Sequence, residues 1–572
     1  MKRRVAAIGA AILAVSLALS ACSGSNESSS PAPAETSSPS ASGNGNPAPA
    51  DKPYWVSNEK ITLKVAIPQN ASVIDYATNE FTKWMEEQTN VHADFEVIPT
   101  DSTSNGLNLL LASGDYPDVY LGFGVSDNLE ATYGVSQHLF LPLNDLIEKN
   151  MPNFQQVLTQ YPATAGIITA TDGNIYALPS INECYHCTYQ QRMWINREWL
   201  EKLGLSEPKT IDELYETLKA FKDNDLNGNG KADEIPLVGA YEGGWNTNIE
   251  PWLVSAFITD PGMNNKTKVS INDGKVLTIA NQPEYKEALS YIRKLYADGL
   301  IYKGSFTQKE DQMKQMLASD PPIVGAFMSG ASVIDIDPNS NEQAYRRYEM
   351  LAPVVGPLGR ENTPKFEYDS IQKGAFLISA QSEKADIAAK WADQFYNNDY
   401  IVQQHRSQGV EDEDWRKATA DEKGLDGRPA LFTGLKAYST EAQNNAWIYV
   451  GIEYYPADYR LGQSVPQVDD LYAPSASEKL LFQETKIKYE PAASETVKPM
   501  PPVKLTVDEN QELLTSSVEI DKYIEEFRVK SITTEGYLEK NWDGYLDRLN
   551  KIGLTKYLEI YQTAYDRQYA NP

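Results

Sequence analysis

Beyond residue 60, the hydrophobic positions of the chain follow a strand-like and a helix-like period in turn. Residues 61–67 alternate apolar and polar side chains, residues 76–89 carry large apolar residues at helical spacing, and residues 91–98 return to a strand pattern. Strands that alternate with helices predict an α/β fold with mainly parallel sheets, whose ligands bind beyond the carboxyl ends of the strands. Tyr120 lies at such a strand end and is therefore a candidate ligand contact.

Three helical patterns close the sequence, over residues 508–527, 536–551 and 556–569. Their large apolar residues, Val518 among them, recur at the spacing of a buried helix face. The aromatic residues of these helices are therefore expected in a core rather than against a ligand.

The first 53 residues follow a different pattern. A Lys-Arg-Arg start and an apolar run over residues 5–18 are typical of an export signal, and the run is short for a membrane span. Leu-Ser-Ala before Cys22 resembles the lipobox of bacterial lipoproteins, which implies that residues 1–21 are removed and that Cys22 is lipidated. Residues 22–53 have little apolar surface to bury and are predicted to be a disordered tether. We expect an exported protein held by lipid alone on the outer face of the bacterial cytoplasmic membrane.

The composition narrows the functional class. The 572 residues include 41% hydrophobic side chains, enough for large cores, and they carry a net charge of −28. This charge argues against nucleic acid and against a basic patch on an anionic membrane, and it suits a soluble extracellular monomer. The sequence has no H-E-x-x-H metalloprotease motif, P-loop or serine-hydrolase elbow.

Residues 221–236, FKDNDLNGNGKADEIP, place carboxylate and amide oxygens at alternate positions of a loop with two glycines. Calcium prefers six to eight such oxygens, and we predict a structural calcium ion here; a solvated turn is the alternative. One register starts at Asp223 and matches the EF-hand pattern. The second register, which we favour because the first puts a lysine where an oxygen belongs, uses Asp225, Asn227, Asn229, Lys231 through its carbonyl, Asp233 and Glu234.

Cys184 and Cys187 are the only cysteines besides Cys22. Outside the cytoplasm this spacing favours a local disulfide, because a zinc site would need two more ligands and His186 alone does not provide them. A redox role would resemble that of C-x-x-C oxidoreductases, whose surrounding sequence this chain does not share.

Several separate motifs carry a resemblance to a known family. In chain order they are SGDYPDV, LPLNDLIEKNMPN, DGNIYALP, MWINREWLEKLGL, DLNGNGKADEIPL and GAFLISAQSEKADIAAKWADQFYN. They resemble the extracellular solute-binding lipoproteins of ABC importers (family 1), especially a large oligosaccharide-binding branch that carries a calcium loop and includes alginate-oligosaccharide-binding proteins. The calcium ligands of that branch match the second register of the loop.

The resemblance implies a two-lobe, periplasmic-binding-protein-like α/β fold of type II with a crossover hinge. We expect residues 54–185 and 320–370 to form lobe 1, and residues 186–319 and 371–572 to form lobe 2. The apolar strand at 322–327 is expected to return to the first lobe, and the two cysteines to stiffen a loop near the first crossing.

The resemblance also implies a function as the substrate-binding subunit of an ABC importer, which captures an oligosaccharide between the lobes and delivers it to the permease subunits. A cell-surface lyase or glycosidase is an alternative, because a catalytic carboxylate pair is defined only by its spatial separation. A binding protein that feeds a sensor kinase is another.

Sugar rings stack on aromatic faces, and polar side chains bind their hydroxyl groups. Residues 241–246 are the strongest candidates, because paired glycines expose the rings beside them. The full set of substrate-binding candidates is Tyr120, Trp194, Tyr241, Trp245, Trp252, Arg406 and Trp447. Burial in a core is the alternative for each aromatic residue. The acidic net charge predicts a neutral or weakly charged oligosaccharide, unless Arg192 or Arg406 offsets it.

Overall fold

The computed structural model describes residues 49, 52–99, 103–367, 370–436, 441–466, 468 and 470–570. The predicted signal peptide, Cys22 and most of the predicted tether lie outside these residues. No helix among the described residues is long and apolar enough to cross a membrane.

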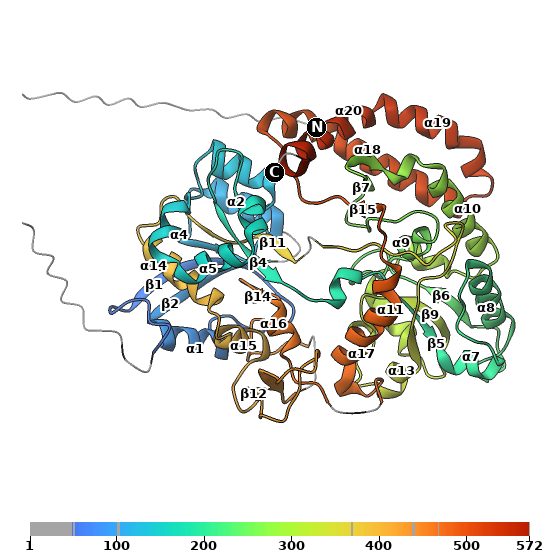
Figure 1. The fold of residues 1–572 in the computed structure, drawn as a ribbon, viewed down its shortest axis with the longest axis horizontal. Helices are drawn as coiled ribbons and strands as arrows, with labels where there is room; N and C mark the ends of the chain where they lie inside the picture. Colours follow the sequence, from blue (N-terminus) through green and yellow to red (C-terminus); the bar gives the residue numbers. More distant parts are fainter. Residues whose placement is uncertain are drawn as a thin grey trace, which may run out of the picture. The chain divides into compact units, whose positions relative to one another are not determined.

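Six strands form the first sheet, in the order β14-β4-β11-β3-β1-β2 (Figure 1). Their bounds are β1 (Ile61–Pro68), β2 (Val91–Ile98), β3 (Val119–Leu121), β4 (Ala177–Asn182), β11 (Ile371–Ile378) and β14 (Tyr454–Tyr455). Strand β1 runs parallel to β2 and β3, whereas β11 runs antiparallel to both of its neighbours. The sheet is therefore mixed, with parallel pairs β14–β4, β3–β1 and β1–β2 and antiparallel pairs on both sides of β11.

Helices flank the first sheet, and the pleat of its strands divides two cores. Leu63, Val65 and Ile67 of β1 join one cluster of buried residues, and Ala66 between them joins the other. The main helices of this lobe are α1 (Glu80–Thr89), α2 (Thr103–Ser113), α4 (Asn144–Asn150), α5 (Pro152–Gln160), α6 (Pro162–Ile168), α14 (Ala385–Asp393), α15 (Ile401–Gln408) and α16 (Ala457–Leu461). A two-stranded sheet of β12 (Trp415–Lys417) and β13 (Phe432–Gly434) follows α15.

Four strands form the second sheet, in the order β10-β5-β9-β6. Their bounds are β5 (Met193–Asn196), β6 (Ile235–Val238), β9 (Val324–Met328) and β10 (Tyr348–Leu351). Met193 and Ile195 face the largest core, and Trp194 faces the opposite side of the sheet. The neighbouring helices are α7 (Arg197–Leu203), α8 (Ile211–Asp223), α9 (Glu250–Ser255), α10 (Pro283–Ala297), α11 (Glu310–Leu317), α12 (Ser332–Asp335), α13 (Glu342–Arg346) and α17 (Ser477–Glu484).

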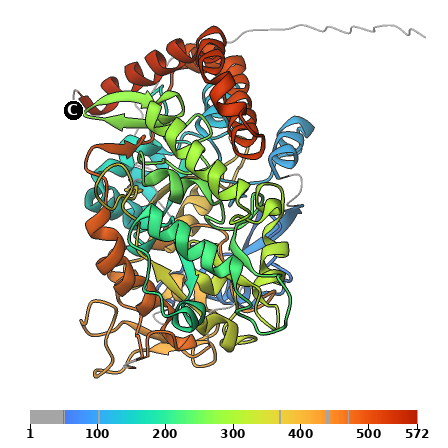
Figure 2. The same cartoon turned by 90° about the vertical axis from the view of Figure 1, so that its right-hand side faces the viewer.

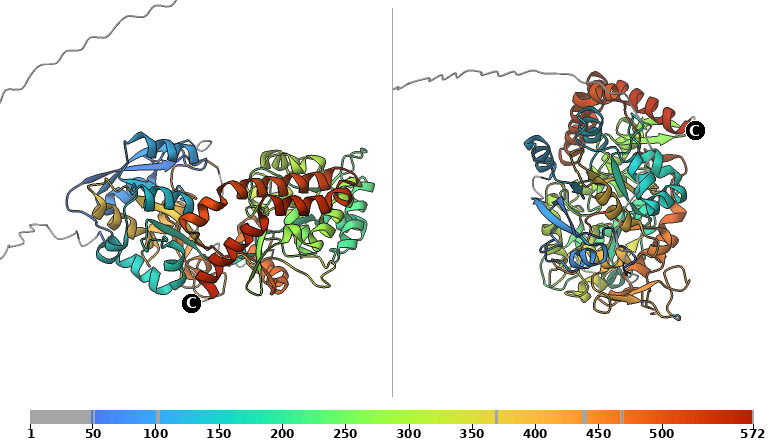
Figure 3. Two further views of the ribbon diagram at one scale, coloured as in Figure 1. Left: turned by 90° about the horizontal axis from the view of Figure 1, so that it is seen from above. Right: turned by 90° about the vertical axis from the view of Figure 1, so that its left-hand side faces the viewer.

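The three predicted C-terminal helices pack on the core of this second lobe. They are α18 (Val507–Thr533), α19 (Tyr537–Lys551) and α20 (Leu554–Tyr565). Figure 3 shows α18 and α19 side by side, and Figure 2 shows them near the hairpin of β7 (Val269–Asn272) and β8 (Lys275–Thr278), which β15 (Val497–Pro499) extends. Val518 is not a core residue as predicted, because its side chain lies on the outer face of α18 and is 67% exposed.

The strand pairing corrects two of the predicted lobe boundaries. Strand β9, predicted to return to the first lobe, instead lies between β5 and β6 of the second sheet. Strand β11, predicted in the second lobe, lies between β3 and β4 of the first sheet. The apolar pattern of a buried strand shows that it is covered on both faces but does not show which strands it pairs with. Residues 320–351 therefore belong with the second sheet, and residues 371–461 belong with the first.

Candidate functional site

Five of the seven predicted substrate contacts are core residues. Exposure is 0% for Tyr120, Trp194 and Arg406, 1% for Trp447 and 4% for Trp252. Only Tyr241 and Trp245 retain partly exposed side chains. These two residues flank the paired glycines Gly243 and Gly244.

Packing explains why the buried tryptophans do not offer a stacking surface. Trp194 lies on the inner face of β5, where its indole N–H donates to the carbonyl of Ser329 at 3.0 Å. Trp252 of α9 donates to the hydroxyl of Tyr489 at 3.3 Å. Each indole N–H is paired within the core, which is the usual arrangement for a structural tryptophan.

Trp447 and Arg406 stabilise the first lobe together. The indole N–H of Trp447 donates to the Thr82 hydroxyl at 3.0 Å. The guanidinium of Arg406 donates to the carbonyls of Trp447 and Val450 at 3.0 and 2.7 Å. These bonds make Arg406 a buried support for the main chain, with no exposed side-chain surface.

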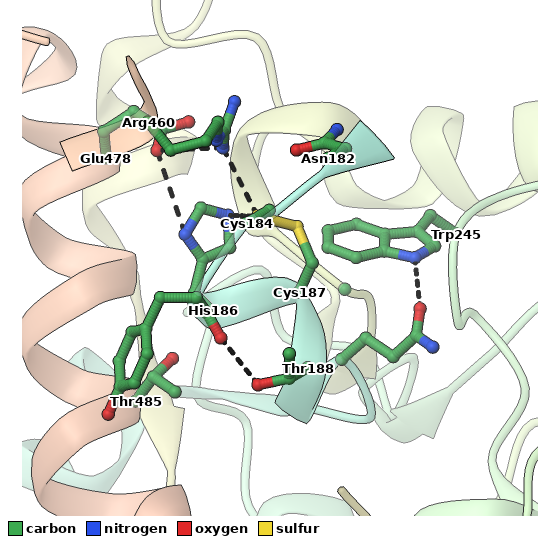
Figure 4. The surroundings of a disulfide bond; sticks show 12 residues. Asn182, Cys184, His186, Cys187, Thr188, Trp245, Arg460, Glu478 and Thr485 are labelled. Carbon is green, nitrogen blue, oxygen red and sulfur yellow. Dashed lines mark hydrogen bonds and ion pairs between the residues drawn. A yellow bond between two sulfur atoms is a disulfide. The ribbon is translucent and has the colours of Figure 1, made fainter. Parts of the chain in front are cut away.

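Trp245 lies in the loop between β6 and α9, and its ring is fixed on two sides. The indole N–H donates to Oε1 of Gln190 at 2.7 Å, and the side-chain amide of Asn246 donates to the same oxygen at 3.0 Å. A Cβ on Gly330 would lie 2.3, 2.4 and 2.8 Å from three atoms of the indole ring, which places that glycine over one face of the ring. The N–H of Gly330 also donates to the Trp245 carbonyl at 2.7 Å. Trp245 is thus a partly exposed ring that is held rigidly, and Figure 4 shows it beside the disulfide loop.

Paired glycines make the turn before Trp245 possible. Gly243 and Gly244 have φ angles of 78° and 74°, in the left-handed region that disfavours other residues. The Thr247 hydroxyl donates to the Gly243 carbonyl at 3.0 Å and closes the turn. A Cβ on Gly244 would lie 2.5 Å from Cγ2 of Thr247, so this position requires glycine for space as well as for conformation.

Tyr241, the other partly exposed ring, lies over a buried cation. Its ring centroid is 5.6 Å from the guanidinium carbon of Arg528 in α18. Arg528 is 3% exposed and forms an ion pair with Glu250 at the start of α9. The cation–π contact links the loop to the C-terminal helices and fixes the position of Tyr241.

Arg192 connects the Trp245 platform, which is the Trp245 ring with its supports Gln190 and Gly330, to two other segments of the chain. Its guanidinium donates to the carbonyls of Gly330 and His186 and, at 3.1 Å, to the hydroxyl of Thr485. Arg192 is fully buried, and burial lowers its pKa to about 10, so the side chain stays charged at neutral pH. By binding the Gly330 carbonyl, Arg192 fixes the glycine that lies against the Trp245 ring relative to the disulfide loop.

The loop that contains His186 is closed by a disulfide between Cys184 and Cys187. Cys184 is buried and Cys187 is partly exposed. The turn also has a backbone hydrogen bond from the Cys187 N–H to the Cys184 carbonyl at 3.1 Å. Gln190, which orients Trp245, follows three residues after the disulfide.

A buried carboxyl group lies in the segment that follows Gly330. Asp335 of α12 is 5% exposed, and burial raises its pKa to about 7. Glu310 of α11 raises it further by charge repulsion, and Lys314 opposes this effect. Glu310 in turn lies close to Gly244, so this carboxyl pair is part of the support of the Trp245 turn.

The predicted calcium loop closes on itself through its own oxygens. Asp225 Oδ1 accepts the N–H groups of Gly228 and Asn229 at 2.8 and 3.1 Å. The side-chain amides of Asn227 and Asn229 donate to Asp233 and lower the pKa of its carboxyl group. Six residues with oxygen atoms that could coordinate a cation therefore lie in one loop of the chain.

The residues of this loop fit a hard cation. Glu234 Oε1 accepts the N–H of Leu226 at 2.9 Å, but Oε2 of the same carboxylate is buried and has no hydrogen-bond partner. A buried carboxylate oxygen without a partner is costly in an apolar surrounding and is the atom that a calcium ion would satisfy. Asp223, which starts the other register, is the last residue of α8 and pairs with Lys219 instead.

Sequence reasoning did not single out two residues that define the platform, Gln190 and Gly330. Gln190 follows the disulfide loop, and Gly330 follows the apolar strand β9. Neither carries a motif, because each acts on Trp245 from more than 50 residues away in the sequence.

Comparison with known proteins gives four further findings. The sequence profile described as "Bacterial extracellular solute-binding protein" matches residues 70–402, more than half of the chain. The fructooligosaccharide ABC transporter substrate-binding protein FusA of Streptococcus pneumoniae is 29% identical over 493 residues, which span 85% of this chain and 86% of FusA. The structure of FusA in complex with kestose superimposes with a TM-score of 0.75 at 26% identity, over 89% of this chain and all of that chain. A FusA EF-hand mutant in complex with fructo-nystose superimposes with a TM-score of 0.73 at 25% identity, over 89% of this chain and all of that chain.

Proposed function

The chain belongs to the bacterial extracellular solute-binding proteins, and we propose that it is the substrate-binding subunit of an ABC importer for a neutral oligosaccharide. This family consists of binding proteins, so the chain is not an enzyme. The fold is the two-lobe α/β fold of periplasmic binding proteins, as in FusA.

The observation that supports the ligand class is the fixed ring of Trp245. Sugar rings present apolar faces that stack on rigid aromatic rings, and a ring that is already held in place loses little entropy on binding. Gln190 and Asn246 place amide groups at the edge of the ring, where sugar hydroxyl groups need partners. The relative FusA is named for fructooligosaccharides, which supports an oligosaccharide ligand for this chain as well.

The buried arginines favour an uncharged ligand. Arg192 and Arg406 were the candidate cations to offset the acidic net charge, but both are fully buried and donate to main-chain carbonyls. Neither offers a free guanidinium to a uronate. The net charge of −28 then opposes binding of an anionic glycan.

We further propose that Asp225, Asn227, Asn229, the Lys231 carbonyl, Asp233 and Glu234 hold a structural calcium ion. The unpartnered oxygen of Glu234, which both registers share, favours a bound cation. The ion pair of Asp223 with Lys219, outside the loop, favours this register over the one that starts at Asp223. The printed description of the FusA mutant names an EF-hand in that relative. The ion would supply positive charge to the converging carboxylates and so fix the loop between α8 and β6.

Lipidation of Cys22, tethering through residues 22–53 and delivery to permease subunits complete the proposal. The sequence before Cys22 supports the anchor, and the name of FusA supports the transporter. A sensor-linked binding protein would share the fold, and loss of sugar uptake on deletion of the gene would separate the two roles.

A titration against a glycan panel tests the proposed function. The purified protein is titrated by calorimetry with kestose, other neutral oligosaccharides and oligouronates, and each mixture is then analysed for shortened products. Tight binding of a neutral glycan without products is expected. Time-dependent shortening would overturn the assignment as a binding protein, and binding only to oligouronates at low salt would overturn the neutral ligand.

A further inference from the structure

The disulfide between Cys184 and Cys187 lies in a polar environment that a purely structural bridge does not need. The sulfur of Cys184 is 3.3 Å from Nη2 of Arg460 and 3.3 Å from Nε2 of His186. Glu478 lies behind both, with its carboxylate 3.6 Å from Arg460 and 3.8 Å from Nδ1 of His186 (Figure 4). These groups come from three separate segments of the chain: His186 and Arg460 contact the sulfur, and Glu478 contacts both of them.

The two sulfur atoms differ in their surroundings. Cys184 is 3% exposed and has the cation beside it, whereas Cys187 is partly exposed. A guanidinium that donates to a sulfur stabilises the thiolate form, which is the reactive and the leaving form in thiol chemistry. The structure therefore places the sulfur of a partly exposed cysteine next to a sulfur whose leaving thiolate would be stabilised by a cation.

We propose that Cys184–Cys187 is a redox-active disulfide that exchanges with external thiols, with Cys187 as the sulfur attacked and Cys184 as the leaving thiolate. The co-reactant is a thiol of small-molecule or protein origin in the extracellular space. The proposal is independent of the sugar site, because it uses none of the residues that hold Trp245 directly.

The exchange proceeds in two balanced steps. An external thiolate attacks Sγ of Cys187, a bond forms between these sulfurs, and the bond to Cys184 breaks with its electron pair left on Cys184. A second external thiolate then attacks the external sulfur of this mixed disulfide and leaves Cys187 as a thiolate. In total two external thiols are oxidised to one disulfide, and the protein disulfide takes up their two electrons and two protons.

His186, oriented by Glu478, can accept a hydrogen bond from the thiol of reduced Cys184. His186 is buried, and burial together with Arg192 and Arg460 holds its pKa well below the ordinary value, so the imidazole is neutral at pH 7. Glu478 faces Nδ1, which leaves Nε2 free to accept a hydrogen bond from the thiol of Cys184. Arg460 donates to the same sulfur when it is a thiolate.

The rate of reduction by glutathione tests the proposal. The native protein is incubated with millimolar reduced glutathione at pH 7, and its free thiols are counted by mass after alkylation. Reduction within minutes to hours is expected, and Arg460→Gln is expected to slow it about three- to tenfold, because the leaving thiolate loses its cation. Arg460→Lys keeps the charge and should react at an intermediate rate. Arg416→Gln is the matched control, because Arg416 pairs with Glu422 and has no contact with sulfur, and it should react at the native rate.

Variants that keep one cysteine of the pair test which sulfur is attacked, and peptide mass mapping separates their reaction from that of Cys22. Cys184→Ser should form a mixed disulfide with oxidised glutathione readily, whereas Cys187→Ser should do so slowly, because its remaining sulfur is buried. Thermal melts of all variants establish that they are folded. A native disulfide that resists glutathione overnight, an Arg460→Gln rate equal to the native rate, or faster reaction of Cys187→Ser than of Cys184→Ser would each overturn the proposal.

Discussion

The indole ring of Trp245 lies directly against the main chain of Gly330, at a distance that leaves no room for a methyl group. A Cβ at position 330 would approach Cε3 of the ring to 2.3 Å, well inside the closest separation that carbon atoms tolerate. The N–H of Gly330 donates to the Trp245 carbonyl, and the Gly330 carbonyl accepts from Arg192. The proposed sugar platform thus rests on a glycine whose N–H and carbonyl are both hydrogen-bonded.

Gly330→Ala is expected to displace the Trp245 ring and weaken sugar binding while the protein remains folded. Overpacking of this kind costs about 1–3 kcal/mol. Calorimetry with the best neutral glycan and a thermal melt measure the two effects. Gly166→Ala in α6 is the control, because a Cβ there meets no atom within 4 Å, and it should leave affinity unchanged. Native affinity in Gly330→Ala would show that the ring position does not matter.

Trp245→Ala is expected to reduce affinity for the neutral oligosaccharide by about thirtyfold. Loss of a ring that stacks in a desolvated site costs about 2 kcal/mol, which corresponds to that factor. Trp245→Phe keeps an aromatic face but loses the N–H that donates to Gln190, so it should retain part of the affinity. An affinity of Trp245→Ala equal to that of the native protein would remove this residue from the site.

Chelation is expected to lower the melting temperature of the native protein. An ion that binds only the folded state stabilises it by about 2.7 kcal/mol at a hundredfold excess over its dissociation constant. Glu234→Gln keeps the oxygen that accepts from Leu226 but removes the carboxylate charge, and it should make the melt insensitive to EDTA. Asp225→Asn should act in the same direction.

Asp223→Asn is the control for the calcium loop. Asp223 pairs with Lys219 and belongs only to the register that we reject, so this variant should keep the full response to EDTA. A lost response in Asp223→Asn would instead support the other register, which shares Asp225 and Glu234 with this one. A native melt that EDTA does not change would mean that the loop is only a turn.

Asp335 is expected to make the protein less stable as the pH rises from about 4 to about 8. Its pKa is about 7 in the folded protein and 3.8 without the fold, so between these values the folded state holds a proton that the unfolded state has lost. The stabilisation that Asp335 contributes is therefore fully present at low pH and is lost as the pH rises through 7.

Asp335→Asn keeps a neutral side chain at every pH and should remove this loss. Its melting temperature is expected to match that of the native protein near pH 4.5 and to exceed it at pH 8. Asp311→Asn, an exposed carboxylate on the same helix as Glu310, is the control for a change in net charge. A melting temperature of Asp335→Asn equal to that of the native protein at pH 8 would show that ionisation of Asp335 does not destabilise the folded state.

The proposed calcium loop and the Trp245 turn show how much of a site a sequence carries when its residues are neighbours in the chain. The six proposed ligands lie within ten residues, so their oxygens are brought together by the turn itself. The paired glycines before Trp245 likewise mark a turn that exposes the adjacent ring, and the structure has positive φ angles at both. Trp194 and Trp447 have no such local signal, and the folded chain buries both.

The sequence by itself determined the α/β class, most of the early strands and helices and the C-terminal helices, because periodicity depends on residues a few positions apart. The tertiary structure alone decided that β9 pairs with β5 and β6, that Gln190 and Gly330 hold Trp245, and that Arg460 faces the sulfur of Cys184. Each of these relationships joins segments that are distant in the sequence. Their contacts arise only when the cores exclude water and fix which buried faces meet, and no pattern within one segment records that choice.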